Sequence, residues 1–218
     1  MSFSVNTNNG AAMALQYLNQ TQGQLNATQS AINSGLKVAN AKDDGAIYAI
    51  AQNQRGAVAG YSSVINSLNN GSSAIDVALS AGQSISDLLI QMKQKALSAA
   101  DPSLDTASRQ ALNANFTALR DQITTIVKNA VFNNFNLVDG STTQVQALAS
   151  ADGTRRITAQ AQNMKLSGSI VTIKTTSTIS TQAKASALIA TIQTSLSNVN
   201  SALAKLSSGA AKFSIQAT

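Results

Sequence analysis

The adjacent carboxylates of Asp43 and Asp44 are the one pair of neighbouring acidic residues in this 218-residue sequence. Two close carboxylates could bind a metal ion or perform acid/base chemistry. All nine acidic residues are Asp, however, and the sequence contains no His, Cys or Glu. These absences exclude a Ser-His-Asp triad, a Cys nucleophile and an ordinary zinc site. We therefore interpret Asp43 and Asp44 as helix caps, and expect neither an enzyme nor a cofactor.

The basic residues suggest a second kind of chemistry. Fifteen Lys and Arg against nine Asp give a net charge of +6, which favours anionic partners. No Asp follows Asp152, and the segment after it carries candidate contacts to an acidic polysaccharide at Arg155, Arg156, Lys165 and Lys174. The stretch 136–212 has no aromatic ring on which a sugar or a base could stack. Nucleic acid is therefore not expected as a partner.

The sequence shows neither a membrane-spanning segment nor a cleavable signal peptide. No stretch approaches the ~20 apolar residues that a membrane-spanning helix needs, so no membrane insertion is expected. The first ten residues are polar and lack the charged start and apolar core of a signal peptide. If the protein is secreted, we expect it to leave the cell by another route.

Apolar residues repeat every seven positions in the first 34 residues. The predicted helix 11–34 carries Leu18, Leu25 and Ile32 on one strip, with Leu15 beside it. This strip is as narrow as a coiled-coil seam, and such a seam needs a partner helix. Gly35 should end the helix, and Asp43 or Asp44 should cap the next one.

Two companion seven-residue series predict a second, very long helix over 44–99, about 84 Å in length. The turn at Asp101-Pro102 and a start at Asp105 or Thr106 make the following helix its antiparallel neighbour. The rod core is predicted to consist of Ile47, Val58, Tyr61, Ile65, Leu68, Ile75, Leu79, Leu89, Leu112, Phe116, Leu119, Ile123, Ile126, Ile189, Ile192, Leu196, Val199 and Leu203.

The pattern changes after residue 131. Hairpins are predicted by the turn-rich segment 132–136 and by the dipeptides Asp139-Gly140 and Asp152-Gly153. Alternation of apolar and polar residues predicts short strands over 144–149, 155–161 and 169–175. Helix returns over about 180–206, and no clear pattern follows Gly209. We predict a mainly α fold with a small β insert, built as an elongated antiparallel coiled-coil-like helical bundle. Its parts are an N-terminal segment 1–40, a helical hairpin 41–131, the insert 132–179 and a returning helix and tail 180–218.

Several strings in this order resemble bacterial flagellin, in particular the short flagellins of alphaproteobacteria. They are Val5-Asn6-Thr7-Asn8, the INSGLK of 32–37, the AKDDGA of 41–46, and the FNN of 132–134 followed by Asn136-Leu137 and Asp139-Gly140. The resemblance covers residues 1 to about 140 and, weakly, 180–208.

The resemblance implies a structural subunit of the flagellar filament, polymerised with other flagellin subunits outside the cell for swimming. It implies export by the flagellar type III machinery with an uncleaved N-terminus and the help of a flagellin chaperone. The helix bearing Leu15, Leu18, Leu25 and Ile32 would belong to the inner tube of the filament. The rods would form the surrounding layer, and the insert would be its outer part.

One departure and two alternatives accompany this interpretation. Flagellins end in a long amphipathic helix that returns to the inner tube, whereas this chain stops about where that helix should begin, so we expect a truncated chain. The first alternative is a cell-surface flagellin homologue that binds an acidic polysaccharide through its basic insert. The second is a hook-associated junction protein, although such proteins usually carry a larger middle domain.

Overall fold

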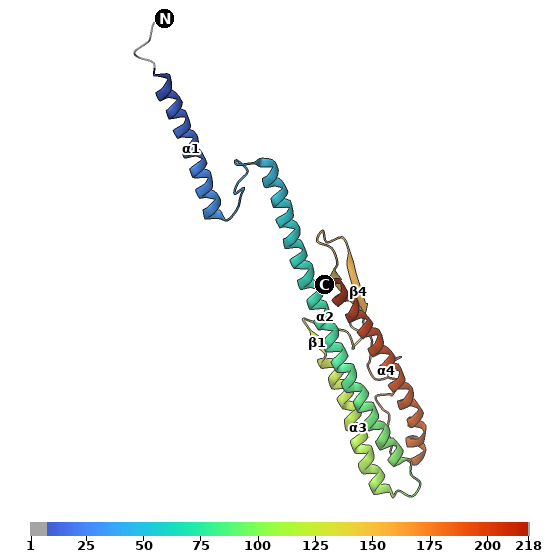
Figure 1. Ribbon diagram of the computed structural model, residues 1–218. Helices are drawn as coiled ribbons and strands as arrows, with labels where there is room; N and C mark the ends of the chain where they lie inside the picture. The colour runs from blue at the N-terminus through green and yellow to red at the C-terminus, as the bar shows by residue number, and fades with distance from the viewer. Residues whose placement is uncertain (1–7, 218) are drawn as a thin grey trace. The chain divides into compact units, whose positions relative to one another are not determined.

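The computed structural model describes residues 8–217. Its helices are α1 (Asn9–Ser34), α2 (Gly45–Ala99), α3 (Thr106–Asn129) and α4 (Gln182–Ala217). Two short strand pairs, β1 (Val131–Phe132) with β2 (Phe135–Asn136) and β3 (Gln144–Leu148) with β4 (Arg156–Gln160), lie between α3 and α4 in the sequence (Figure 1). The chain divides into two compact units, Met1–Val58 and Ala59–Thr218, with the boundary inside α2. The expected mainly α fold with a small β insert is confirmed.

The first unit contains a helix with clear start and stop signals. The side chain of Asn8 caps α1 by accepting a hydrogen bond from the Ala11 amide at 3.1 Å. Gly35 adopts a left-handed φ of 66°, which glycine tolerates without strain, and ends the helix at the predicted place. None of the residues of α1 is buried.

The two adjacent carboxylates have different structural roles. The Asp44 carboxylate accepts from the Ile47 amide at 3.0 Å, which caps the start of α2. The Asp43 carboxylate instead accepts from the amides of Ala39 and Asn40, both at 3.2 Å, and holds the turn before the helix. Asp44 is therefore the helix cap, and the prediction that Asp43 is a cap as well was wrong.

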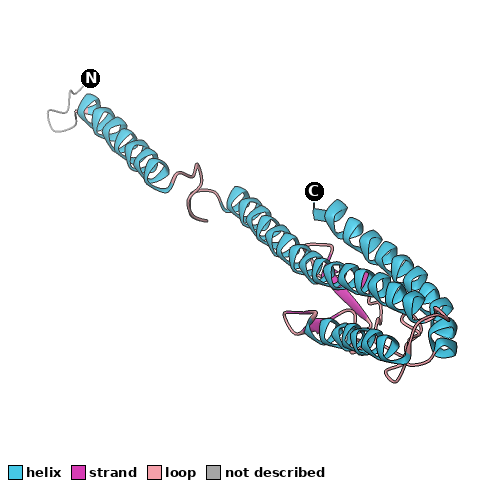
Figure 2. Ribbon diagram, turned by 90° about the horizontal axis from the view of Figure 1, so that it is seen from below, coloured by secondary structure: helices cyan, strands magenta, loops and turns pink. Residues whose placement is uncertain are grey.

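In the second unit, α3 and α4 lie along the part of α2 that follows Ala59 (Figures 1 and 2). The Asp105 carboxylate caps α3 by accepting from the Ser108 amide at 2.9 Å. The Arg109 guanidinium donates to the carbonyls of Ala99 and Asp101, both at 2.8 Å, and so satisfies acceptors at and just after the end of α2. These bonds fix the short turn that makes α2 and α3 antiparallel neighbours.

Helix α4 runs antiparallel to α2 and is longer than predicted. Ser86 of α2 faces Asn200 of α4, and Gly82 faces Leu203. The expectation that no pattern follows Gly209 was wrong, because Gly209 and Phe213 are both buried and the helix continues to Ala217. Phe213 lies one seven-residue step after Leu206, so the apolar series of α4 extends beyond Gly209.

Most of the predicted rod core lies inside the second unit. Leu68, Ile75, Leu89, Phe116, Ile123, Ile192 and Val199 are buried, and Leu79, Leu112, Leu119, Ile126, Ile189, Leu196 and Leu203 pack against them. Four predicted members are exposed instead, so their assignment to the core of the single chain was wrong: Ile47, Val58, Tyr61 and Ile65. Within the second unit, Ala151 of the β3–β4 turn already lies on Gly60, so covering of α2 begins only near that residue. A seven-residue pattern identifies an apolar seam but does not say which neighbour covers it.

The insert packs on the helices and shares their core. Asn133 and Asn134, with φ of 45° and 67°, form the two-residue turn that joins β1 to β2. Strands β3 and β4 and the Asp152-Gly153 turn lie where the alternation predicted them. The predicted strand 169–175 is wrong: among the described residues it makes only an isolated bridge, from Leu166 to Val171. Its alternation reflects one-sided burial, since Val171 and Ile173 are buried. The Thr172 amide between them donates to the Ser195 hydroxyl rather than to a strand.

Candidate functional site: uncovered apolar seams

Helix α1 exposes the whole of its apolar seam. Leu15, Leu18, Leu25 and Ile32 are 61%, 63%, 49% and 75% exposed. The helix carries no charged residue, so ion pairs cannot hold a neighbour against it. Full burial of an apolar side chain of this size contributes about 1.5–3 kcal/mol, and covering the exposed part of these would contribute roughly half to three-quarters of that. Helix α1 can therefore associate with a partner helix through apolar contacts alone.

The apolar seam of α2 is exposed in the first unit and in the first residues of the second unit, and is covered beyond them. Ile50 and Tyr61, at 59% and 61% exposed, precede the region in which Val64 and Leu68 are buried. The predicted core residues Ile47, Val58 and Ile65 belong to the exposed part. The first part of α2 therefore presents a second apolar surface for a partner.

The basic residues of the insert do not gather into one site. Arg155 and Arg156 lie at the turn end of the β3–β4 hairpin, and the Arg156 guanidinium donates to the Gln146 side chain at 3.3 Å. Lys165 and Lys174 lie in the loops after β4, where Lys165 lines a small hollow of about 220 Å³ beside Lys128. The two pairs thus belong to different segments, the β3–β4 turn and the loops that follow β4. This separation does not favour capture of an acidic polymer by the four residues together.

Most of the acidic residues act in turns and caps. Ser150 and Thr154 donate to the Asp152 carboxylate from their hydroxyls, and the Thr154 amide adds a third bond, which together lower the pKa of Asp152 to about 2. No group of three potential metal-ligating side chains occurs in the part of the chain that the structure describes. Asp152 thus fixes the backbone of the β3–β4 turn.

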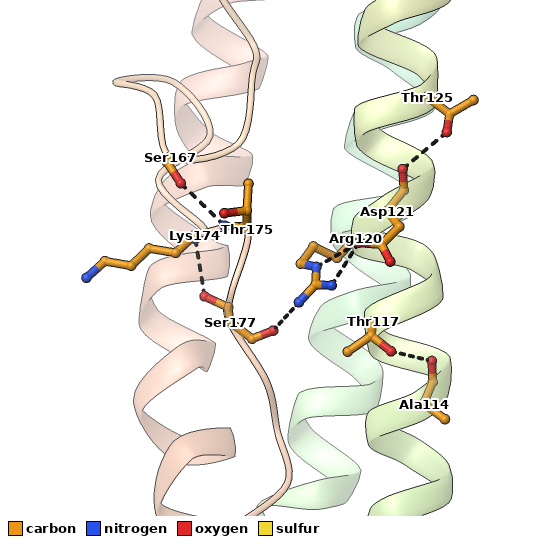
Figure 3. A network of polar contacts seen from close by, with 9 residues as sticks. All are labelled: Ala114, Thr117, Arg120, Asp121, Thr125, Ser167, Lys174, Thr175 and Ser177. Atoms are coloured by element: carbon orange, nitrogen blue, oxygen red, sulfur yellow. Dashed lines mark hydrogen bonds and ion pairs between the residues drawn. The ribbon is translucent and has the colours of Figure 1, made fainter.

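Sequence reasoning missed a partly buried polar anchor, Arg120 of α3 (Figure 3). Its guanidinium donates to the Ser177 carbonyl at 2.9 Å and pairs with Asp121 at 2.8 Å. The Arg120 side chain is only 13% exposed, whereas that of Asp121 is 67% exposed. The contact ties the end of the insert to α3. Nothing in the sequence around Arg120 marks it, since its partner is a backbone carbonyl 57 residues away.

A helical bundle with uncovered apolar seams, in which Asp44 and Asp105 cap helices and Asp152 holds a turn, defines a structural protein that functions by association. Comparison with known proteins gives the family. The sequence model of one protein family, the bacterial flagellin N-terminal helical region, matches residues 5–143. The chain belongs to the bacterial flagellin family.

Relatives and a solved structure agree with this assignment. Flagellin FljK and flagellin FljO of Caulobacter vibrioides are 48% and 47% identical over 203 residues, which cover 93% of this chain and 73% of each relative. The crystal structure of Bacillus cereus flagellin superposes with a TM-score of 0.61 at 22% identity, over 69% of this chain and 85% of that one, and supports the fold.

The chain is accordingly a structural subunit of the flagellar filament, not an enzyme, and it polymerises with other flagellin subunits outside the cell. No helix within residues 8–217 has the length and apolarity to span a bilayer. The family does not favour the alternative of a polysaccharide-binding surface protein.

Proposed function

We propose that the exposed seam of α1 is the contact through which this subunit joins the inner tube of the filament. The carrying observation is that all four seam residues of an uncharged helix are exposed. In this proposal the rods of α2, α3 and α4 form the surrounding layer, and residues 132–179 form its outer part. The exposed first part of α2 supplies a further apolar contact with a neighbouring helix.

We also propose that the subunit leaves the cell through the flagellar type III machinery with its N-terminus uncleaved, escorted by a flagellin chaperone. An uncovered apolar strip favours aggregation before assembly, which gives a chaperone a physical purpose. The string Val5-Asn6-Thr7-Asn8, which carries part of the family resemblance, lies mostly outside the described residues. Export is tested by measuring the protein in the culture medium of strains with and without a functional flagellar export gate. Equal amounts from both strains would contradict this route.

The seam proposal is tested by replacing Leu18 and Leu25 together with Ser in the complete gene product. Both side chains are exposed, so the monomer should keep its helix content and its unfolding midpoint, whereas the filament yield should fall by at least about tenfold. Gln20→Ser is the matched control, because Gln20 lies about 200° around the helix from Leu18. Normal filament yield from the double variant, measured by sedimentation and electron microscopy, would refute the role of the seam.

A further inference from the structure

A groove in the second unit lies between α2, the β1–β2 hairpin and β3. We name it the α2–β3 groove; its volume is about 670 Å³, and no ionisable side chain lines it. Helix α2 contributes a stripe from Ser63 to Ala74, which is about 16 Å long at 1.5 Å per residue. An extended chain rises about 3.3 Å per residue, so the groove accommodates roughly five residues of extended peptide.

One wall of the groove is the free edge of β3. The bonds from the Ala149 amide to the Arg155 carbonyl and from the Ala161 amide to the Thr143 carbonyl bracket the β3–β4 ladder. Because hydrogen-bonded pairs alternate along an antiparallel ladder, the backbone groups of the even-numbered residues of β3 point away from β4. The bond from the Leu148 amide to the Ser67 hydroxyl, at 3.0 Å, runs in this outward direction.

Two even-numbered residues of β3, Gln144 and Gln146, line the groove. Within residues 8–217 the backbone amides of these two residues donate to no protein group. An unpaired edge of this kind is a template for addition of another strand. Water satisfies these groups in the free subunit, and the backbone of an added strand would satisfy them in a complex.

The side chains around this edge select the kind of strand. Phe135 is 47% exposed on the hairpin beside the edge and offers an apolar contact, with Phe132 also in the wall. The amides of Asn66 and Asn70 offer hydrogen bonds from α2. A charged side chain would enter this uncharged groove without a partner, which costs free energy. The groove therefore fits an extended segment rich in uncharged polar side chains.

The chain itself has this composition. About two-fifths of its residues are Ser, Thr, Asn or Gln, and only 11% are charged. We propose that an extended segment of a second copy of the chain adds to the free edge of β3 in the α2–β3 groove. This proposal rests on polymerisation of the subunit, and it assigns one of the contacts between neighbouring copies in the filament.

Hydrogen exchange on filaments of the complete gene product tests the proposal directly. The amides of Gln144 and Gln146 should exchange rapidly in the monomer and at least about 100-fold more slowly in the filament. The Ala147 amide, which belongs to the β3–β4 ladder, serves as the internal control in both states. Filaments in which Gln144 and Gln146 still exchange rapidly would overturn the groove contact and leave the subunit's function intact. A complete absence of filaments would contradict assembly itself and, with it, this contact.

A pair of neighbouring substitutions on α2 gives an independent readout. Asn70 lines the groove and Asn69 does not, although both are exposed on the same helix. Asn70→Arg should raise the critical concentration for assembly about tenfold, while Asn69→Arg leaves it unchanged. Equal behaviour of the two variants would overturn the proposal. Protection of the Gln144 and Gln146 amides in the monomer by a neutral oligosaccharide would also overturn it, in favour of a sugar site.

Discussion

Phe213 of α4 lies directly against the α-carbon of Gly71 on α2. A β-carbon at Gly71 would stand 2.6 Å from Cε2 and 3.0 Å from Cδ2 of the ring. Both residues are buried, and the contact holds the last turns of α4 against the middle of α2. Gly71 is therefore required for close approach of the two helices, although glycine weakens a helix interior.

Replacing Gly71 with Ala should destabilise the second unit by about 1–3 kcal/mol, because the new methyl group overlaps the Phe213 ring. Gly56→Ala is the matched control on the same helix. Nothing lies within 4 Å of its β-carbon position, so the better helix propensity of Ala should not destabilise the protein. Urea unfolding followed by circular dichroism measures both variants. A Gly71→Ala protein as stable as the parent would contradict the packing described.

Replacing Arg120 with Met should lower the free energy of unfolding by about 1–3 kcal/mol. The reason is that the Ser177 carbonyl loses its partly buried donor (Figure 3). Asp121→Asn removes the ion pair but keeps the bond to Ser177. Because Asp121 is mostly exposed, this control should change stability by less than about 1 kcal/mol. Urea unfolding that ranks the two variants in the opposite order would show that the ion pair dominates.

Stability should be independent of pH between about 5 and 8, since the chain contains no His, Cys or Glu side chain to titrate there. Hydrogen bonds from the Ser150 hydroxyl and from Thr154 lower the pKa of Asp152 to about 2. A lowered folded-state pKa contributes stability above the ordinary value of about 3.9, and this contribution is lost as the pH falls through the folded value. The melting temperature should thus begin to fall only below about pH 4.

Thermal unfolding at a series of pH values checks this prediction. The pKa values of Asp101 and Asp105 are lowered too, the first mainly by the Ser103 amide and the second mainly by the Ser108 hydroxyl. The loss on acidification should therefore be distributed over several turns, and Asp152→Asn should remove only part of it. A melting temperature that drops between pH 8 and pH 5 would be inconsistent with this composition-based account.

The helices could be predicted from the sequence because their signals are local. Gly35 and Asp105 mark helix ends through their own backbone and side chain, and both lie at the helix ends where they were expected. The β3–β4 hairpin was equally accessible, since strand alternation and the Asp152-Gly153 turn lie within one short stretch. Such signals need no knowledge of the rest of the fold.

The features that sequence analysis missed depend on partners distant in the chain. Tyr61 belongs to the same seven-residue series as the buried Leu68, and Ile65 to the companion series of Leu79. Only the position of the covering segments separates the exposed members from the covered ones. The polar anchor Arg120 binds a carbonyl, which every residue carries. The α2–β3 groove likewise exists only once the β1–β2 hairpin and β3 lie beside α2.

Thiol labelling of Leu18→Cys tests most directly the proposed burial of the α1 seam between subunits. The chain has no native cysteine, so a single introduced thiol reports one position. Leu18 is 63% exposed in the single chain, and the thiol should react rapidly in the monomer and at least about 100-fold more slowly in filaments of the complete gene product. Thr154→Cys, in the exposed β3–β4 turn, should react at similar rates in both states. Equal labelling of Leu18→Cys in monomer and filament would contradict this proposal.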